Sequence, residues 1–218
     1  MRLAVHILFI LIALPVQAEM FAAAGRIEDP ASGGICSASL IRPDVIVTAA
    51  HCISDLEDPA YVFRSSIPGT EPVRVERFVL HPFYVGFKEQ RFRRLRFDIA
   101  VGQLAAPADV GSISPFSLGN EAEKGEGLFL ASWRQRSGSR PRLRRCFVIE
   151  GQVAGIVTLG CQVRGGESGA PVLRLTDDGL ELVAIINSTA RYKGQQVALA
   201  ADVRLRIPPL LGQLSSAP

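Results

Sequence analysis

Three short segments of the sequence carry the residue types that nucleophilic attack on a carbonyl group would need. Ser168 lies in the glycine-rich segment 165–171, His51 ends an apolar run, and Asp98 opens another. A serine hydroxyl is a poor nucleophile at neutral pH and needs a base, for which imidazole is well suited. A buried carboxylate on the other imidazole nitrogen sets the tautomer and stabilises the cation that forms. We therefore predict Ser168 as nucleophile, His51 as base and Asp98 as the carboxylate that orients His51.

The glycines around Ser168 favour a second catalytic feature. Attack on a carbonyl creates an oxyanion, and each N–H group aimed at it lowers the barrier by about 2.7–4 kcal/mol. Glycine tolerates the backbone conformations that bring two such N–H groups together. We expect the oxyanion hole to be formed by the N–H groups of Gly166 and Ser168.

Each of these residues also has an ordinary structural interpretation. His51 could be a hydrogen-bonded core histidine, Asp98 a turn or capping residue, and Ser168 a serine in a glycine-rich turn. An unpaired carboxylate at the start of an apolar strand would be costly, which favours a partner for Asp98. The other histidine beyond the leader, His81, precedes Pro82 and is interpreted as a structural loop residue. The three residues together in one chain favour the catalytic interpretation.

The elements that must position these residues are short β-strands separated by turns rich in Gly, Pro, Asp and Asn. No long segment keeps an apolar period of 3.6 residues, and helix is expected only after His51 and around 202–206, with Pro208-Pro209 interrupting anything longer. Many short strands with tight turns indicate antiparallel barrels, linked through the Ala- and Pro-rich segment 105–117. The predicted strands are 35–41, 45–49, 61–64, 73–80, 99–104, 127–132, 145–150, 152–159, 170–175, 180–186 and 196–200.

The first 18 residues have the pattern of a secretory signal peptide: a basic residue, an apolar run and small residues at its end. The apolar run is shorter than the roughly 20 residues that span a bilayer, so we favour a cleaved signal over a retained anchor. The net charge of +3 does not favour a nucleic-acid partner. Arginines cluster at 91–96 and 134–145, either as solvated faces or as a patch for acidic partners.

Four cysteines in an exported chain predict two disulfides, for which three pairings exist. Cys36 with Cys52 and Cys146 with Cys161 are the local choices, and each bond would add about 3 kcal/mol of stability. The alternative is a metal site of cysteines and histidines. No C-x-x-C pair occurs, so we expect no metal.

The three segments, in the order His, Asp, Ser, resemble the chymotrypsin/trypsin family of serine proteases, and that order differs from the subtilisin and α/β-hydrolase arrangements. The resemblance covers about 24–206. It implies two antiparallel six-stranded β-barrels packed together, with the active site in the cleft between them. Residues 19–112 would form the first barrel, with His51 and Asp98, and residues 113–218 the second, with Ser168. It also implies the Cys36–Cys52 bridge, while Cys146 and Cys161 resemble a pair in bacterial members.

The sequence departs from the family beside the nucleophile. The usual aspartate before the serine is Glu167 here, and in zymogens of the family that aspartate pairs with a newly cut N-terminus. Arg26-Ile27 resembles such a cleavage site, but only eight residues separate Ile27 from Cys36. We expect Ile27 to lie in the first strand and predict no activation by cleavage there.

The residues that would choose the substrate also differ from trypsin. Gln162 stands where trypsin-like members carry an aspartate, Arg164 replaces a cysteine, and Asn187 and Thr189 lie in the strand that would pair with substrate. A neutral glutamine cannot hold a basic side chain, so Gln162, Asn187 and Thr189 predict a specificity pocket without trypsin's preference. Arg164 would favour an acidic side chain if it points into the pocket.

The resulting expectation is a secreted or periplasmic serine endopeptidase that needs no cofactor and acts on peptide or protein substrates. No nucleic acid and no stable membrane anchor are expected, and the sequence gives no oligomeric state. The alternative is a catalytically silent relative that acts as a binding protein.

Overall fold

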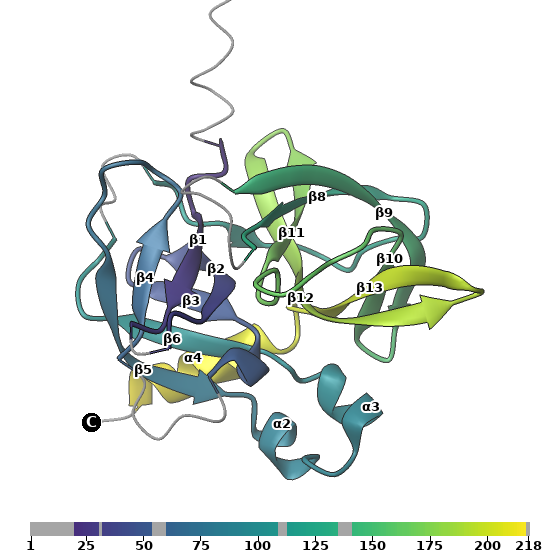
Figure 1. Cartoon of the computed structure of the whole chain (residues 1–218), viewed down its shortest axis with the longest axis horizontal. Coiled ribbons are helices and arrows are strands. Elements are labelled where there is room, and N and C mark those ends of the chain that lie inside the picture. The colour runs from purple at the N-terminus through teal and green to yellow at the C-terminus, as the bar shows by residue number, and fades with distance from the viewer. Residues whose placement is uncertain (1–19, 31, 54–59, 109–112, 135–140, 217–218) are drawn as a thin grey trace, which may run out of the picture.

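The computed structural model describes residues 20–30, 32–53, 60–108, 113–134 and 141–216, and its strands form two groups lying side by side (Figure 1). The strands of the first group are β1 (Ala24–Glu28), β2 (Ile35–Arg42), β3 (Val45–Thr48), β4 (Val62–Ser65), β5 (Val73–Leu80) and β6 (Ala100–Leu104). The other strands are β7 (Ser117–Leu118), β8 (Gly127–Ser132), β9 (Arg142–Val153), β10 (Ile156–Leu159), β11 (Pro171–Thr176), β12 (Gly179–Tyr192) and β13 (Gln195–Asp202).

The first group is a closed barrel with the strand order β1-β2-β3-β6-β5-β4. β1 closes it by pairing antiparallel with β2 on one side and with β4 on the other. Ile27 lies in the middle of β1, opposite Cys36 and Phe63, and is fully buried. Ile27 is therefore part of the barrel core, as the sequence predicted for a residue of the first strand.

The second group closes in the same way. Its sheet has the order β11-β8-β9-β10-β13-β12-β7, and an added pairing of β11 with β12 joins the ends into six antiparallel strands. β7 is an extra short strand that pairs parallel to β12. The predicted fold class, all-β with two six-stranded antiparallel barrels, is confirmed.

Two hairpins of the second barrel turn on residues that adopt positive φ. Ala154 and Gly155 join β9 to β10 with φ of 52° and 84°, and Lys193 and Gly194 join β12 to β13 with φ of 48° and 81°. Two successive residues with positive φ match the right-handed twist of the strands they connect, and glycine adopts this conformation without a steric penalty. The Lys193-Gly194 turn falls between the predicted strands 180–186 and 196–200, whereas the predicted strand 152–159 is divided here by a turn at Ala154-Gly155.

Helix is more extensive than the sequence indicated. The 3₁₀ helix η1 (Ala50–Cys52) follows β3 as expected, but α2 (Pro82–Gly86) and α3 (Arg91–Leu95) were not predicted. The expectation that Pro208-Pro209 would prevent a helix is wrong, because α4 runs over Ile207–Ser216. Both prolines lie in the first turn of α4. Backbone N–H groups in a first turn have no partner within the helix, so the missing N–H of proline costs little there.

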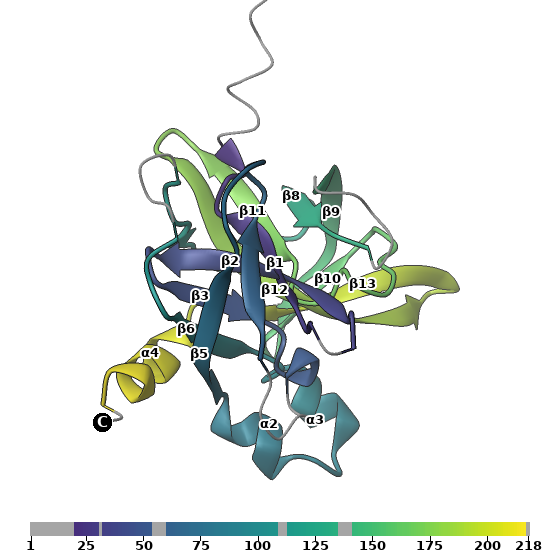
Figure 2. The same ribbon diagram turned by 60° about the vertical axis from the view of Figure 1, so that its left-hand side comes forward.

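α4 follows the last strand of the second barrel but packs against β5 and β6 of the first (Figures 1 and 2). Its buried Ile207 and Leu210 belong to the same apolar cluster as residues of the first barrel. The predicted division at 112/113 and the predicted leader 1–18 involve residues outside those the structure describes. No described helix is both long enough and apolar enough to cross a bilayer.

Candidate active site

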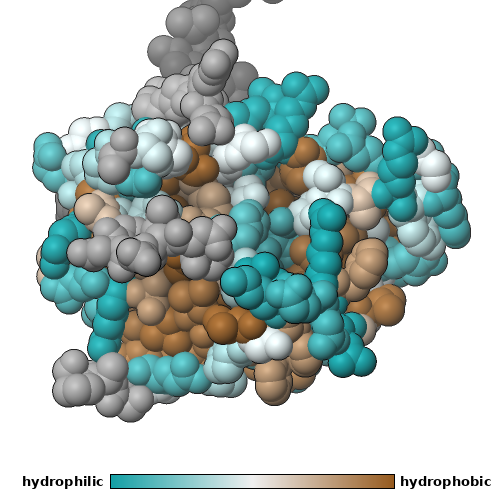
Figure 3. Space-filling model, turned by 60° about the horizontal axis from the view of Figure 1, so that its bottom comes forward, coloured by the Kyte–Doolittle hydropathy of each residue, from teal (hydrophilic) through white to brown (hydrophobic). Residues whose placement is uncertain are grey.

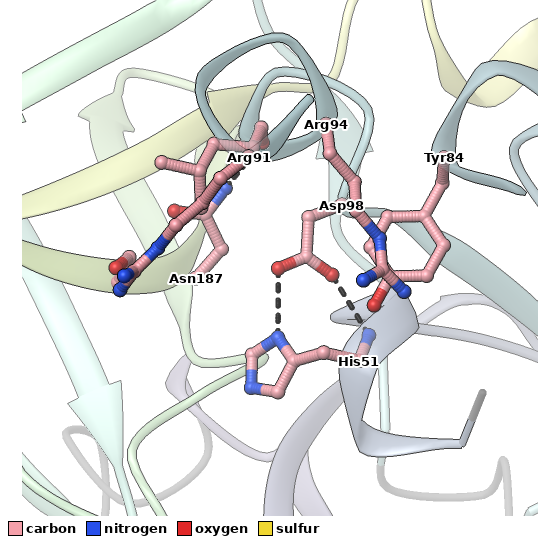
Figure 4. Close-up of a pocket in the computed structure, with 8 residues that line it drawn as sticks. His51, Tyr84, Arg91, Arg94, Asp98 and Asn187 are labelled. Atoms are coloured by element: carbon pink, nitrogen blue, oxygen red, sulfur yellow. Dashed lines mark hydrogen bonds and ion pairs between the residues drawn. The ribbon is translucent and has the colours of Figure 1, made fainter. Parts of the chain in front are cut away.

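His51 and Asp98 form the best-defined polar contact of the site. Nδ1 of His51 lies 2.7 Å from Oδ2 of Asp98, and the backbone N–H of His51 donates to Oδ1 at 2.8 Å (Figure 4). The Asp98 side chain is 4% exposed and that of His51 37%. Because an ionised carboxylate only accepts hydrogen bonds, Nδ1 of His51 carries the proton, which leaves Nε2 as the acceptor nitrogen.

The local fold determines where these two residues lie. η1 begins where β3 ends and places His51 at the edge of the first barrel, while Asp98 lies between α3 and β6. The Asp98 N–H donates to the carbonyl of Leu95 at 3.3 Å, and the side-chain amide of Asn187 donates to the same carbonyl at 2.6 Å. Since Asn187 belongs to β12, a strand of the second barrel holds the turn that carries Asp98.

Ser168 lies in the turn between β10 and β11, and this turn is bonded to the first barrel. The N–H of Ser37 in β2 donates to the carbonyls of Ser168 and Gly166 at 2.8 and 3.1 Å, and the Ser37 hydroxyl also donates to Gly166 at 3.1 Å. Gly169 has φ of 78°, and a side chain there would meet the Ser37 carbonyl and Thr48 Oγ1. The contact between turn and strand therefore requires glycine at position 169.

A disulfide connects the two halves of the site. Cys36, which precedes Ser37, is bonded to Cys52, which follows His51, with an S–S distance of 2.02 Å. The strand that holds the Ser168 turn is thus covalently joined to the turn that carries His51. Cys146 is bonded to Cys161, which lies seven residues before Ser168 in the same barrel. Both local pairings expected from the sequence are present.

Two hollows adjoin the predicted catalytic residues. One, of about 240 Å³, is lined by residues that include His51, Asp98 and Asn187, and another, of about 300 Å³, includes Ser168 and Thr189. Ser188 lines both hollows, so the two hollows adjoin at this residue.

The predicted specificity residues divide between these hollows. Asn187 lies on the His51 side and Thr189 on the Ser168 side. Gln162 is exposed and lines neither hollow, whereas the next residues, Val163 and Arg164, line the hollow that contains Ser168. Of these two residues, Arg164 and not Gln162 lines the hollow that contains Ser168.

Glu167, next to Ser168, is fully buried and is held by groups distant in the sequence. Its Oε1 accepts from the Ser132 hydroxyl at 2.7 Å and from the Arg144 guanidinium at 3.0 Å, and Arg134 lies 3.6 Å away. Its Oε2 accepts from the backbone N–H of Arg164 at 2.7 Å. Arg134 and Arg144, both in the arginine-rich segment 134–145, therefore contact a buried carboxylate. The sequence could not indicate this contact, because the residues are far apart along the chain.

One cluster near the site has metal-ligating residue types. Ligand atoms of Cys36, His51 and Cys52 lie within 4.8 Å of one another. Zinc and similar ions bind the thiolate form of cysteine, and these two sulfur atoms are bonded to each other. This cluster therefore does not fit a metal ion while the disulfide is intact.

Another hollow lies apart from the site, on a face where hydrophobic surface gathers (Figure 3). It measures about 480 Å³, and Phe83, Phe97 and Leu205 contribute to its wall. It shares no lining residue with the hollows around His51 and Ser168. The catalytic interpretation makes no use of it.

Comparison with known proteins agrees with this architecture. Residues 14–203 match the trypsin family (Trypsin). The chain belongs to the trypsin family. A curated relative is Serine protease 28 of Mus musculus, to which the chain is 29% identical over 109 residues. That match covers 45% of this chain and 38% of the mouse protein, so it spans less than half of the relative's length.

The mouse relative is by its name a serine protease, and its match covers less than half of either chain. The family match agrees with the two-barrel fold. Neither bears on the resemblance of Cys146 and Cys161 to a bacterial pair, which stays a prediction. The roles of His51, Asp98 and Ser168 within this trypsin-family chain are proposals, developed next.

Proposed function

We propose that the protein is a serine endopeptidase that hydrolyses peptide bonds through an acyl-enzyme intermediate. The observation that carries the proposal is the buried contact of Asp98 with both the ring and the backbone of His51. A carboxylate this buried is costly unless it is paired, and its partner is an imidazole at the edge of the cleft. The turn of Ser168 is bonded to the strand that is linked by a disulfide to the His51 turn.

In this mechanism, His51 Nε2 takes the proton of the Ser168 hydroxyl as its oxygen attacks the substrate carbonyl. Asp98 accepts from Nδ1, which fixes the tautomer and stabilises the imidazolium. His51 then gives the proton to the leaving amine, and water releases the acyl group by the same route in reverse. The reaction as proposed needs no metal and no cofactor.

The oxyanion would be held by the N–H groups of Gly166 and Ser168. Within the part of the chain that the structure describes, neither N–H donates to a protein acceptor. Gly166 has φ of 88°, a conformation that favours glycine. Between them, Glu167 is buried and bonded to Ser132, Arg144 and the Arg164 N–H. These contacts hold the turn in a shape compatible with two converging donors.

The decisive experiment is labelling of the folded, disulfide-intact protein with a fluorophosphonate, with Ser168→Ala as the control. We expect the wild-type protein to be labelled and the variant not. Labelling should accelerate as pH rises through roughly 6–7.5, because only neutral imidazole accepts a proton. A flat pH profile would argue against His51 as the base.

The alternative function is that of a catalytically silent binding protein, for which the unusual Glu167 is the only reason. Absence of labelling in correctly folded wild-type protein would favour it. Under either function, we propose export to the periplasm or the cell exterior after removal of residues 1–18. We also propose that residues 19–112 and 113–218 are the two barrel domains.

A further inference from the structure

Three arginines line the cleft on both sides of the proposed catalytic residues. Arg91 and Arg94 belong to the wall of the hollow that contains His51, and Arg164 belongs to the hollow that contains Ser168. Figure 4 shows the side chains of Arg91 and Arg94 on either side of the Asp98–His51 pair. Because Ser188 lines both hollows, a peptide that crosses Ser188 from one hollow to the other would pass all three arginines.

Two of these arginines come from α3, the short helix inserted before Asp98. Arg94 is half-buried, and its guanidinium lies 3.9 Å from the ring centroid of the buried Tyr84. Stacking on an aromatic ring restricts the guanidinium while leaving its N–H groups available. Arg91, one turn earlier on α3, is exposed and reaches the same hollow. The helix thus presents a charged wall that is fixed relative to His51.

The charge of these three residues is not compensated locally. Among the described residues that line either hollow, Asp98 is the only carboxylate, and both its oxygens are engaged by His51. Among the described residues, no carboxylate lies within ion-pair distance of Arg91, Arg94 or Arg164. Six arginines elsewhere in the described residues are paired with carboxylates, namely Arg26, Arg64, Arg134, Arg144, Arg174 and Arg206.

A further hollow that includes His51 has an acidic rather than a basic residue in its wall. It measures about 310 Å³, and the charged residue in its wall apart from His51 is Asp29. Among the residues described around these three hollows, the arginines without a carboxylate partner thus line the two hollows that meet at Ser188.

We propose that the substrate is an acidic peptide segment whose carboxylates bind Arg91 and Arg94 in one hollow and Arg164 in the other. This inference rests on the proposed peptidase function and names its substrate class. Guanidinium groups form paired, charge-assisted hydrogen bonds with carboxylates, which fix both position and orientation. An acid near the cleaved bond meets Arg164, and an acid farther along the peptide meets Arg91 and Arg94.

Binding can be tested without turnover by using the Ser168→Ala protein. Its affinity for a fluorescent peptide of alternating Glu and Ala is compared with that for the matching Gln–Ala peptide. We expect the acidic peptide to bind at least about tenfold more tightly in low salt, and the difference to shrink as salt screens the charges. The combined substitution Arg91→Gln and Arg94→Gln should remove most of the difference, and Arg164→Gln should reduce it further.

Arg93→Gln is the matched control, because Arg93 lies on the same helix, is exposed and lines neither hollow. It should leave the preference for Glu over Gln intact. Equal affinity for the two peptides, or a preference that survives loss of all three cleft arginines, would overturn the proposal. Fluorophosphonate labelling of the wild-type protein decides the peptidase function separately, so the two failures are distinguishable.

With active wild-type protein, the same preference should appear in kcat/KM. For each position around the cleaved bond, two peptides are compared that differ only by having Glu or Gln at that position. The ratio of kcat/KM, Glu over Gln, should exceed about ten at one position or more and approach one in the variant lacking the facing arginine. An active enzyme that cleaves both peptides equally well at every position would contradict the inference.

Discussion

At the scale of single residues, the site depends on side chains that are recognisable by type and on others that are not. His51, Asp98 and Ser168 could be proposed as a triad from the sequence because an imidazole, a carboxylate and a hydroxyl can together carry out one reaction. The partners of Glu167 could not, because Ser132 and Arg144 lie 35 and 23 residues away in sequence. A run of arginines has the same composition whether it faces water or a buried carboxylate.

Gly169 allows a direct test of the backbone geometry behind Ser168. In Gly169→Ala, the new methyl group would meet the Ser37 carbonyl and Thr48 Oγ1, in addition to the cost of positive φ. For alanine, the positive φ alone costs about 1–2 kcal/mol of unfolding free energy. We expect a larger loss of unfolding free energy, measured by urea denaturation, and a loss of fluorophosphonate labelling.

Gly125→Ala is the control for this substitution. Gly125 has φ of 85° and nothing within 4 Å of the position that a side chain would occupy. Gly125→Ala should lose only the unfolding free energy that positive φ costs alanine, and it should retain labelling. Equal losses in the two variants would mean that contact with Ser37 is not what requires glycine at 169.

Glu167 leads to a prediction about activation. Since Arg144 already lies 3.0 Å from its carboxylate, no newly cut N-terminus is needed to neutralise it. N-terminal sequencing of the active protein should give a start before Ile27, and Arg144→Gln should slow labelling about tenfold or more. Arg145→Gln, an exposed neighbour, should not. A start at Ile27 would contradict this view.

At the scale of elements, strands could be predicted more readily than helices. Runs of apolar and β-branched residues between turn residues identified nearly every strand. α2 and α3 are only five residues each, too short to show a helical period, and they were missed. This matters for function, because α3 carries Arg91 and Arg94. α4 was missed because prolines in its first turn resemble a helix-breaking signal.

The titration of His81, which caps α2, makes the stability of the protein depend on pH. His81 caps α2 by accepting from the Phe83 N–H at 3.3 Å, and burial, followed by the Arg206 guanidinium, lowers the pKa of His81. The unfolded chain therefore binds a proton more readily between that lowered pKa and about 6.5, so stability falls as pH drops through this window. His81→Asn keeps a capping acceptor without titrating. Urea denaturation at pH 7.5 and 5 should show a smaller loss for this variant than for wild type. An equal loss would exclude His81 as a contributor.

The two disulfides should differ in their effect on activity but not on stability. They span 16 and 15 residues, so replacing either pair by serine should cost about 3 kcal/mol. Only Cys36–Cys52 connects the His51 turn to the strand that holds Ser168. Its loss should reduce the labelling rate more than loss of Cys146–Cys161, at a temperature where both variants remain folded. Equal reductions would show that the bond position is unimportant.

At the scale of the whole molecule, the two barrels are held together by elements that cross between them. α4 follows the second barrel and packs on β5 and β6, and Asn187 of β12 bonds to the turn that carries Asp98. The barrels themselves could be expected from many short strands and from the family resemblance. The crossing of α4 could not, because it depends on which apolar surface remains uncovered once both barrels have closed.

Leu210 tests this crossing. It is fully buried in α4, and Leu210→Ala should lower the unfolding free energy by about 2–5 kcal/mol. Leu205→Ala, at a residue that is 67% exposed, should change it by less than about 0.5 kcal/mol. Fluorescence of Trp133, the single tryptophan, follows unfolding and should show one transition. Two transitions in wild type would mean that the barrels unfold independently.

The Cys36–Cys52 bond also makes the proposed activity sensitive to redox conditions. In a reducing compartment such as the cytosol, cysteines stay as thiols, so the disulfide between the His51 turn and the Ser37 strand would not form. Under the proposed export, a chain that folded in the cytosol would hold Ser168 and His51 less firmly in position. Oxidation outside the cytosol would then complete the proposed site, and this one bond would keep the proposed peptidase less active inside the cell that makes it.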